Sequence, residues 1–262
     1  METSAAEMAN GSVYRVACTI CGNSSTIKHY EQRLDKDARV CQISQCSECL
    51  VLLNETDLST LTNGGDDIAI LQAESSDHFY AIDEEFKLNF EQTVRNNSII
   101  DFMMAHAPID SLKNFLDFGA GQGIVAATAV RYFETVFAVE LSLNVLLKVH
   151  EFMPDRHRIF VTNNLDQICS KFDAIATMHV LEHIPELGPV MELLRSKLQP
   201  GGVLMFQVPL LRSDYIVPTH YTFFNEVSVR KMAEKFNFVV EGVWFDVGLD
   251  FLTAIFRRPH EA

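Results

Sequence analysis

Short runs of consecutive apolar residues recur through the second half of the chain. They alternate with longer segments typical of helices, such as the alanine-rich run that begins after residue 123. A run that is apolar at every position predicts a strand buried on both faces, and alternation with helices predicts a parallel sheet. The predicted strands cover residues 114–118, 136–139, 158–162, 172–178 and 203–209, with helices over 123–132, 142–152 and 187–198 between them.

One further region follows the alternating strands and helices, and another precedes them. Residues 238–245 and 249–257 predict an antiparallel pair of strands that closes the sheet. In front of the alternating region, residues 66–108 are expected to form a helical lid or linker, because apolar side chains such as Phe86 and Phe90 recur there at helical spacing.

The first predicted strand ends in a glycine-rich turn. Asp117 is followed by Gly119, Gly121 and Gly123. Glycine accepts a positive φ and lets backbone N–H groups approach a ligand closely, so strand, turn and helix together predict a nucleotide-binding unit. The dinucleotide pattern G-x-G-x-x-G would need a glycine at position 124, which is Ile124. The carboxylate before the turn opposes a pyrophosphate and favours a cationic ligand.

The D-x-G-x-G-x-G turn resembles motif I of the class I S-adenosylmethionine (AdoMet)-dependent methyltransferases. Later segments that are similar to the same family follow in the expected order: Glu140 after the second strand, 172–185 with its L-E-H sequence, the P-G-G turn at 200–202 and the H-Y-T-F-F stretch at 220–224. The resemblance covers roughly residues 110–258. It implies a Rossmann-like seven-stranded α/β sheet with helices on both faces, in a methyltransferase domain at 109–262.

The resemblance also implies which residues hold AdoMet. Asp117 suits the charged end of the cofactor, Glu140 suits the ribose hydroxyls, and either Asn163 or Asn164 would hold the adenine amine. The full set of implied cofactor residues is Asp117, Gly119, Ala120, Gly121, Gly123, Glu140, Leu141, Asn163, Asn164, Met178 and His179.

Four residues are candidates for catalysis on the acceptor side: His220, Tyr221, His183 and His179. Imidazole titrates near neutral pH, so each histidine could act as a general base. His220 is the first choice because it lies on the loop that resembles the family's substrate loop. One helical turn would bring His179 and His183 to the same side. Phe79 and Tyr80 of the lid either contact the acceptor or belong to the core.

The N-terminal part carries two C-x-x-C pairs, Cys18 with Cys21 and Cys46 with Cys49. Paired motifs of this kind predict one tetrahedral structural zinc, here in a zinc-ribbon-like module at 13–53. Strand-like segments between the pairs could form the ribbon. The remaining cysteines fall outside the pattern and are expected to be structural or free.

Net charge and hydropathy limit which binding partners we expect for this chain. The net charge of −14 opposes binding to a phosphate backbone, so a small-molecule acceptor is expected rather than a nucleic acid. No apolar run approaches the roughly 20 residues that span a bilayer, and no signal pattern is recognisable at the N-terminus. We therefore expect a cytoplasmic protein without a membrane partner; the oligomeric state is left open.

Two other functions stay open at this point. The first is a methyltransferase that uses the ribbon to bind RNA or protein, and the second is a non-catalytic module that binds AdoMet or zinc. The ribbon in front resembles methyltransferases of sugars and natural products, but the C-terminal domain of the sugar enzymes is not expected here. The identity of the acceptor atom (O, N, C or S) and the need for a base are also open.

Overall fold

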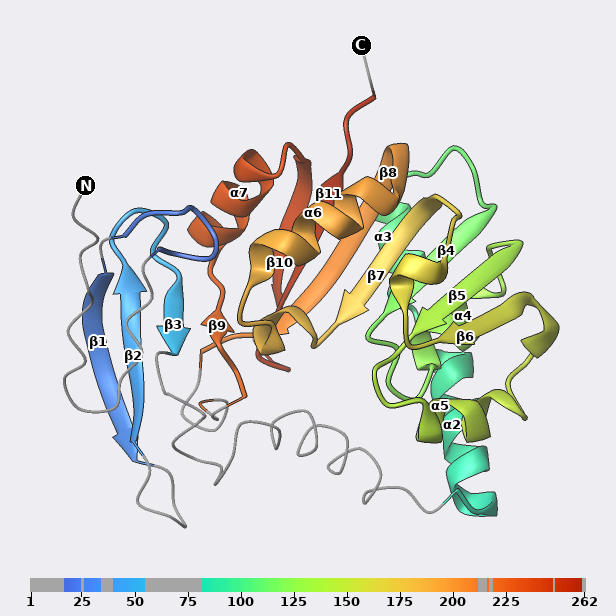
Figure 1. The fold of residues 1–262 in the computed structure, drawn as a ribbon. Coiled ribbons are helices and arrows are strands. Elements are labelled where there is room, and N and C mark those ends of the chain that lie inside the picture. The colour runs from blue at the N-terminus through green and yellow to red at the C-terminus, as the bar shows by residue number, and fades with distance from the viewer. Residues whose placement is uncertain are drawn as a thin grey trace.

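The computed structural model describes residues 17–24, 26–33, 40–54, 82–211, 216, 219–246 and 248–260. Its main feature is a seven-stranded sheet with helices on both faces (Figure 1). In spatial order its strands are β10 (Val239–Asp246), β11 (Phe251–Arg257), β8 (Leu198–Pro209), β7 (Phe172–Met178), β4 (Asn114–Phe118), β5 (Thr135–Val139) and β6 (Ile159–Thr162). Strands β8 to β6 are mutually parallel, and β11 and β10 pair antiparallel at one edge. The predicted fold class is confirmed.

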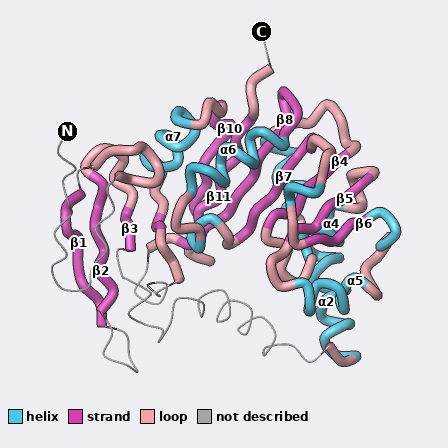
Figure 2. The backbone as a smooth tube through the Cα atoms, in the orientation of Figure 1, coloured by secondary structure: helices cyan, strands magenta, loops and turns pink. Residues whose placement is uncertain are grey.

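Helices fill the connections between the strands (Figure 2). They are α2 (Glu84–Asn96), α3 (Ile99–His106), α4 (Ile124–Ala129), α5 (Leu143–His150), α6 (Leu187–Lys197) and α7 (Glu226–Lys235), with short 3-10 turns η2 (Arg156–Arg158), η3 (Leu165–Gln167) and η4 (Leu181–His183). Most lie within a residue or two of the predicted bounds, although α4 ends three residues earlier than predicted. No helix among the described residues is long and apolar enough to cross a membrane.

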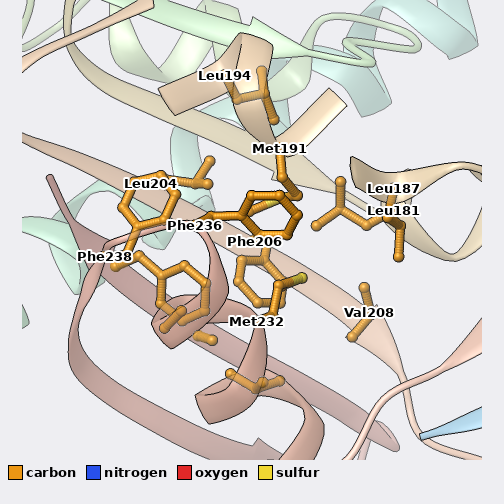
Figure 3. Packing of buried hydrophobic residues seen from close by; sticks show 14 of the residues in the cluster. Leu181, Leu187, Met191, Leu194, Leu204, Phe206, Val208, Met232, Phe236 and Phe238 are labelled. Atoms are coloured by element: carbon orange, nitrogen blue, oxygen red, sulfur yellow. The ribbon is translucent and has the colours of Figure 1, made fainter. Parts of the chain in front are cut away.

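The sheet separates two apolar cores. Because side chains of a strand alternate between its faces, Leu204 and Phe206 of β8 pack with α6 and α7, while Met205 packs with the helices of the opposite face. Figure 3 shows the first of these cores, in which Phe206 lies among Leu204, Met191 and Met232. On the other face α2 and α3 pack against α4, so these two helices share the core of the domain.

A second, smaller sheet carries the cysteine pairs. It has the order β1 (Thr26–Arg33), β2 (Val40–Cys46), β3 (Leu52–Asn54) and β9 (Thr222–Phe223), all antiparallel. Strand β9 belongs to the loop between β8 and α7, so the two parts of the chain share a sheet (Figure 1). The domain bounds predicted from the sequence had not included this pairing.

Candidate functional site

A cavity of about 600 Å³ lies where β4 and β5 end. This is the edge at which open α/β sheets bind ligands, and the volume is within the range of small-molecule sites. The lining residues are Asn97, Ile99, Asp117, Gly119, Ala120, Gly121, Gln122, Ile124, Val125, Glu140, Ser142, Val145, Met178 and Gln207.

The glycine turn forms the wall between the two strands. Gly119 has a φ of 76°, and its N–H and that of Ala120 donate to the Val139 carbonyl at 2.8 and 3.0 Å. A Cβ at Gly119 would lie 2.2 Å from a methyl of Val180. The turn therefore needs glycine here both for its backbone angles and for close packing.

Asp117 lies in this wall and is almost fully buried, with 2% of its surface exposed. Its Oδ2 accepts a hydrogen bond of 2.9 Å from the Ala126 N–H at the start of α4. Burial raises the pKa of Asp117 to about 7; the Ala126 N–H opposes this shift and the Glu140 carboxylate adds to it. The cavity thus holds an acid that ionises near neutral pH and that a bound cation would stabilise in its charged form.

Glu140 follows β5 directly and faces the same cavity. Its Oε2 accepts from the Gly121 N–H at 2.8 Å and its Oε1 from the Ser142 N–H at 3.2 Å. These two bonds fix the carboxylate while each oxygen keeps a further lone pair. Glu140 is thereby held as an acceptor for two neighbouring hydroxyl groups of a ligand.

The structure places the residues of the implied cofactor set in two groups. Those that line the cavity are Asp117, Gly119, Ala120, Gly121, Glu140 and Met178. Gly123 lies behind the turn, where its Cβ would meet Met153. Leu141 is 82% exposed, Asn163 is exposed, and Asn164 uses its side chain to cap η3.

Sequence reasoning missed several lining residues, among them Asn97, Ile99 and Gln207. Asn97 and Ile99 lie at the junction of α2 and α3, so the region predicted as a helical lid does border the cavity. Their only signal was the polar break in the helical pattern at 96–98. Phe79 and Tyr80 lie outside the described residues.

His179 and His183 do not lie on one helical turn, contrary to the prediction. His179 follows β7 with a φ of 56°, whereas His183 is the last residue of the short turn η4, which begins at Leu181. The His179 Nε2 lies 3.2 Å from Gln207 Oε1, and its ring contacts Phe251. The His179 side chain thus contacts β8 and β11.

The His183 ring instead contacts the His220 ring. Their ring centroids are 4.6 Å apart at an angle of 73°, and the His183 Nδ1 lies 3.0 Å from the Thr219 carbonyl. The Tyr221 N–H donates to the Glu182 carbonyl at 2.7 Å. The turn after β7 and the loop before β9 thus bring together three of the four catalytic candidates.

The small sheet holds this loop in place. Asn54 of β3 donates its side-chain N–H to the His220 carbonyl at 3.1 Å and its backbone N–H to the Tyr221 carbonyl at 2.9 Å. Asn225, the cap of α7, donates to the Leu50 carbonyl. The position of His220 therefore depends on the part of the chain that carries the cysteines.

The four predicted zinc ligands form one cluster. All four sulfurs lie within 4.8 Å of one another; Cys18 and Cys49 are 3.6 Å apart, and Cys21 and Cys46 are 3.5 Å apart. Sulfurs around a tetrahedral zinc with 2.3 Å bonds would lie about 3.8 Å apart. The cluster therefore has the size that one zinc ion requires.

The chain also matches a known family over most of the large sheet. The family model described as "Methyltransferase domain" matches residues 91–243, which is more than half of the chain. The chain belongs to the methyltransferase domain family.

Curated relatives of this methyltransferase include ubiquinone biosynthesis O-methyltransferases. The protein of Chromobacterium violaceum is 32% identical over 130 residues, covering 47% of this chain and 54% of that protein. The protein of Xylella fastidiosa is 26% identical over 135 residues, covering 45% and 54%. The chain thus spans about half the length of the curated relatives it matches.

Solved structures support the fold of this methyltransferase. The N-methyltransferase NodS from Bradyrhizobium japonicum, in complex with S-adenosyl-L-homocysteine, has a TM-score of 0.56 at 15% identity and covers 72% of this chain and 98% of its own. An S-adenosylmethionine-dependent methyltransferase from Mesorhizobium loti has a TM-score of 0.51 at 15% identity, covering 63% of this chain and all of its own. The expected methyltransferase domain is confirmed by the family model, and its fold is confirmed by these structures.

Proposed function

We propose that this chain transfers a methyl group from AdoMet to a small-molecule acceptor. The observation that carries the proposal is the pair of acids beside the glycine turn: Asp117 in β4 and Glu140 after β5 face one cavity of about 600 Å³. AdoMet supplies an activated methyl group on a sulfonium. The protein supplies the alignment that an in-line transfer requires and, for a hydroxyl acceptor, a base.

The acids would bind different parts of the cofactor. The buried Asp117 carboxylate suits an ammonium group, because its charge is poorly screened by water. Glu140, held by two N–H groups, suits the ribose hydroxyls. Ala120, Gly121 and Met178 would complete the contacts. Because Asn163 and Asn164 do not line the cavity, we assign the adenine contact to neither of them.

The acceptor would bind beside His183 and His220. A carbonyl can only accept, so the hydrogen on His183 Nδ1 points to Thr219 and leaves Nε2 as the basic nitrogen. His220 reaches the same place from the loop that β3 anchors, with Tyr221 next to it. An acceptor hydroxyl could thus meet an imidazole that removes its proton.

The proposed function includes a small-molecule acceptor and a structural zinc ion. The net charge of −14 opposes an RNA substrate, and the matched relatives are named as O-methyltransferases of ubiquinone biosynthesis. Zinc on Cys18, Cys21, Cys46 and Cys49 would stabilise the sheet that positions His220.

The test is methyl transfer from labelled AdoMet. The full chain is incubated with AdoMet labelled in its methyl group and, separately, with a metabolite extract, total protein or total RNA. We expect label in a low-mass product only. Label confined to protein or RNA would overturn the small-molecule assignment, and no transfer to any fraction would count against the activity itself.

With the acceptor in hand, His220→Ala should lower the rate by roughly 10²- to 10⁴-fold if an imidazole there acts on the acceptor proton. AdoMet affinity should change little, because His220 does not line the cavity. His157→Ala, at an exposed position on η2, is the matched control. A near-normal rate for His220→Ala would reduce His220 to a packing residue.

A further inference from the structure

Glu182, His183 and His220 form a cluster of nitrogen and oxygen ligands. One ligand atom from each residue lies within 4.8 Å of those of the other two. Glu182 and His183 come from η4, and His220 comes from the loop before β9. Residues distant in sequence therefore converge on one point, separate from the cysteine cluster.

The buried carboxylate of Glu182 is the second observation that points to a ligand. Glu182 is 1% exposed, and its Oε2 has no hydrogen-bond partner among the residues that the structure describes. Its other oxygen, Oε1, lies 3.6 Å from His179 Nδ1. A buried carboxylate is costly unless each oxygen is paired, so Oε2 lacks a partner that a cation would supply.

The hydrogen bond of His183 is also consistent with a bound metal ion. Its Nδ1–H is held by the Thr219 carbonyl at 3.0 Å, which fixes the tautomer and leaves the Nε2 lone pair as the ligand atom. Metal-binding histidines are usually held in this manner, by a carbonyl or carboxylate on the nitrogen that does not bind the metal.

We propose that Glu182, His183 and His220 bind a divalent transition-metal ion of the zinc and cobalt class. Two imidazoles and one carboxylate are a donor set that such ions prefer, whereas magnesium and calcium prefer oxygen ligands alone. Ligand atoms around an ion with bonds of 2.0–2.2 Å lie about 3–3.5 Å apart. The three ligand atoms already lie within 4.8 Å of one another, so small side-chain movements on binding would give that spacing.

The side chain of His179 would lie between the ion and the cavity proposed for the cofactor. His179 lies next to Glu182 and contacts Gln207, which lines the cavity. Three protein ligands leave at least one coordination position open. If the proposed function holds, that position is suited to a hydroxyl oxygen of the acceptor, and the bound ion, in place of a free imidazole, would make that hydroxyl more acidic, which makes hydroxyl compounds the expected substrate class. This last step rests on the proposed function, whereas the metal site itself does not.

The test is a cobalt titration without AdoMet or acceptor. The reduced full chain is stripped of metal, one equivalent of zinc is added to occupy the four cysteines, and Co²⁺ is then titrated while the visible spectrum is recorded. We expect one equivalent of Co²⁺ to bind with weak bands and without the intense charge-transfer absorption of thiolate ligands.

Substitutions of the proposed ligands test which residues bind the Co²⁺ ion. Glu182→Gln and His220→Ala should each weaken Co²⁺ binding at least 10- to 100-fold, while Cys169→Ser and His157→Ala, both at exposed positions outside the two clusters, should leave both sites unchanged. Thermal melting identifies any variant that fails to fold, in which case His183→Ala replaces it. Absence of a second metal in the wild-type chain, or its full retention in these variants, would overturn the proposal. Cobalt binding without methyl transfer would overturn the proposed function and leave this site standing.

Discussion

AdoMet should bind about tenfold more tightly near pH 8 than near pH 6, because the buried Asp117 must ionise to meet the ligand's positive charge. The pKa of this carboxyl is raised to about 7, mainly by burial. A ligand that requires the ionised form then loses affinity as the pH falls below 7. Isothermal titration calorimetry at several pH values measures the dependence directly.

The same shift predicts how the ligand-free protein responds to pH. Because the pKa of Asp117 in the folded chain lies above the ordinary aspartate value of 3.8, folding favours the protonated form. Its contribution to stability is complete below about pH 4 and is lost as the pH rises through 7. AdoMet should therefore raise the melting temperature more near pH 8 than near pH 6.

Asp117→Asn is the matched variant for both measurements. It keeps the size of the side chain and removes the ionisation, so affinity near pH 8 should fall and the pH dependence should disappear. An affinity in the unchanged chain that does not vary between about pH 6 and pH 8 would show that Asp117 does not face the charged end of the ligand.

Cys46→Ser is expected to release the proposed zinc and to loosen the acceptor side of the site. Structural zinc supplies on the order of 10 kcal/mol to small domains, so its loss should unfold the small sheet. Because β3 pairs with β9 and Asn54 holds the His220 loop, methyl transfer should fall by at least an order of magnitude. AdoMet affinity should stay close to that of the unchanged chain.

Elemental analysis and hydrogen exchange measure these effects. Zinc should fall from about one per chain to none, and exchange should rise in residues 40–54 and 219–223. Cys169→Ser is the control, because Cys169 is exposed and lies outside the cluster. A metal-free protein with an unchanged exchange pattern in both segments would contradict the proposed structural role of zinc.

Local sequence signals were sufficient for the large sheet. Strand β7 has the predicted bounds, Phe172–Met178, since all its residues except Asp173 and Thr177 are apolar and a strand buried on both faces needs such a run. The first predicted strand likewise matches β4. Asp173 breaks the run for a local reason, because its carboxylate accepts from two backbone N–H groups at the start of β4.

The junction of the two sheets could not be predicted in this way. The Asn54 side chain contacts the His220 carbonyl across 166 positions of sequence, and neither residue stands in a periodic pattern that indicates the other. Strand β9 is two residues long, so it carries no alternation of its own. Only the folded arrangement shows that β3 holds the loop that carries His220.

The site residues likewise fall into those that local sequence predicted and those that depend on the folded structure. Asp117 and Glu140 follow from a turn and a strand end, both of which are local features, and both line the cavity. Gln207 was missed because nothing in an apolar strand indicates which polar residue faces a cavity. The positive φ of His179 redirected a side chain whose position had been inferred from helical spacing.

The most direct test of the account is the affinity for AdoMet beside that for NAD, measured by calorimetry on the unchanged chain and on Glu140→Ala. The account predicts that AdoMet binds and that NAD binds far more weakly, because Asp117 opposes a pyrophosphate. Loss of the Glu140 carboxylate should weaken AdoMet by about 1–3 kcal/mol, or roughly 5- to 150-fold. Tighter binding of NAD than of AdoMet, or an AdoMet affinity indifferent to Glu140→Ala, would contradict the assignment of this cavity to AdoMet.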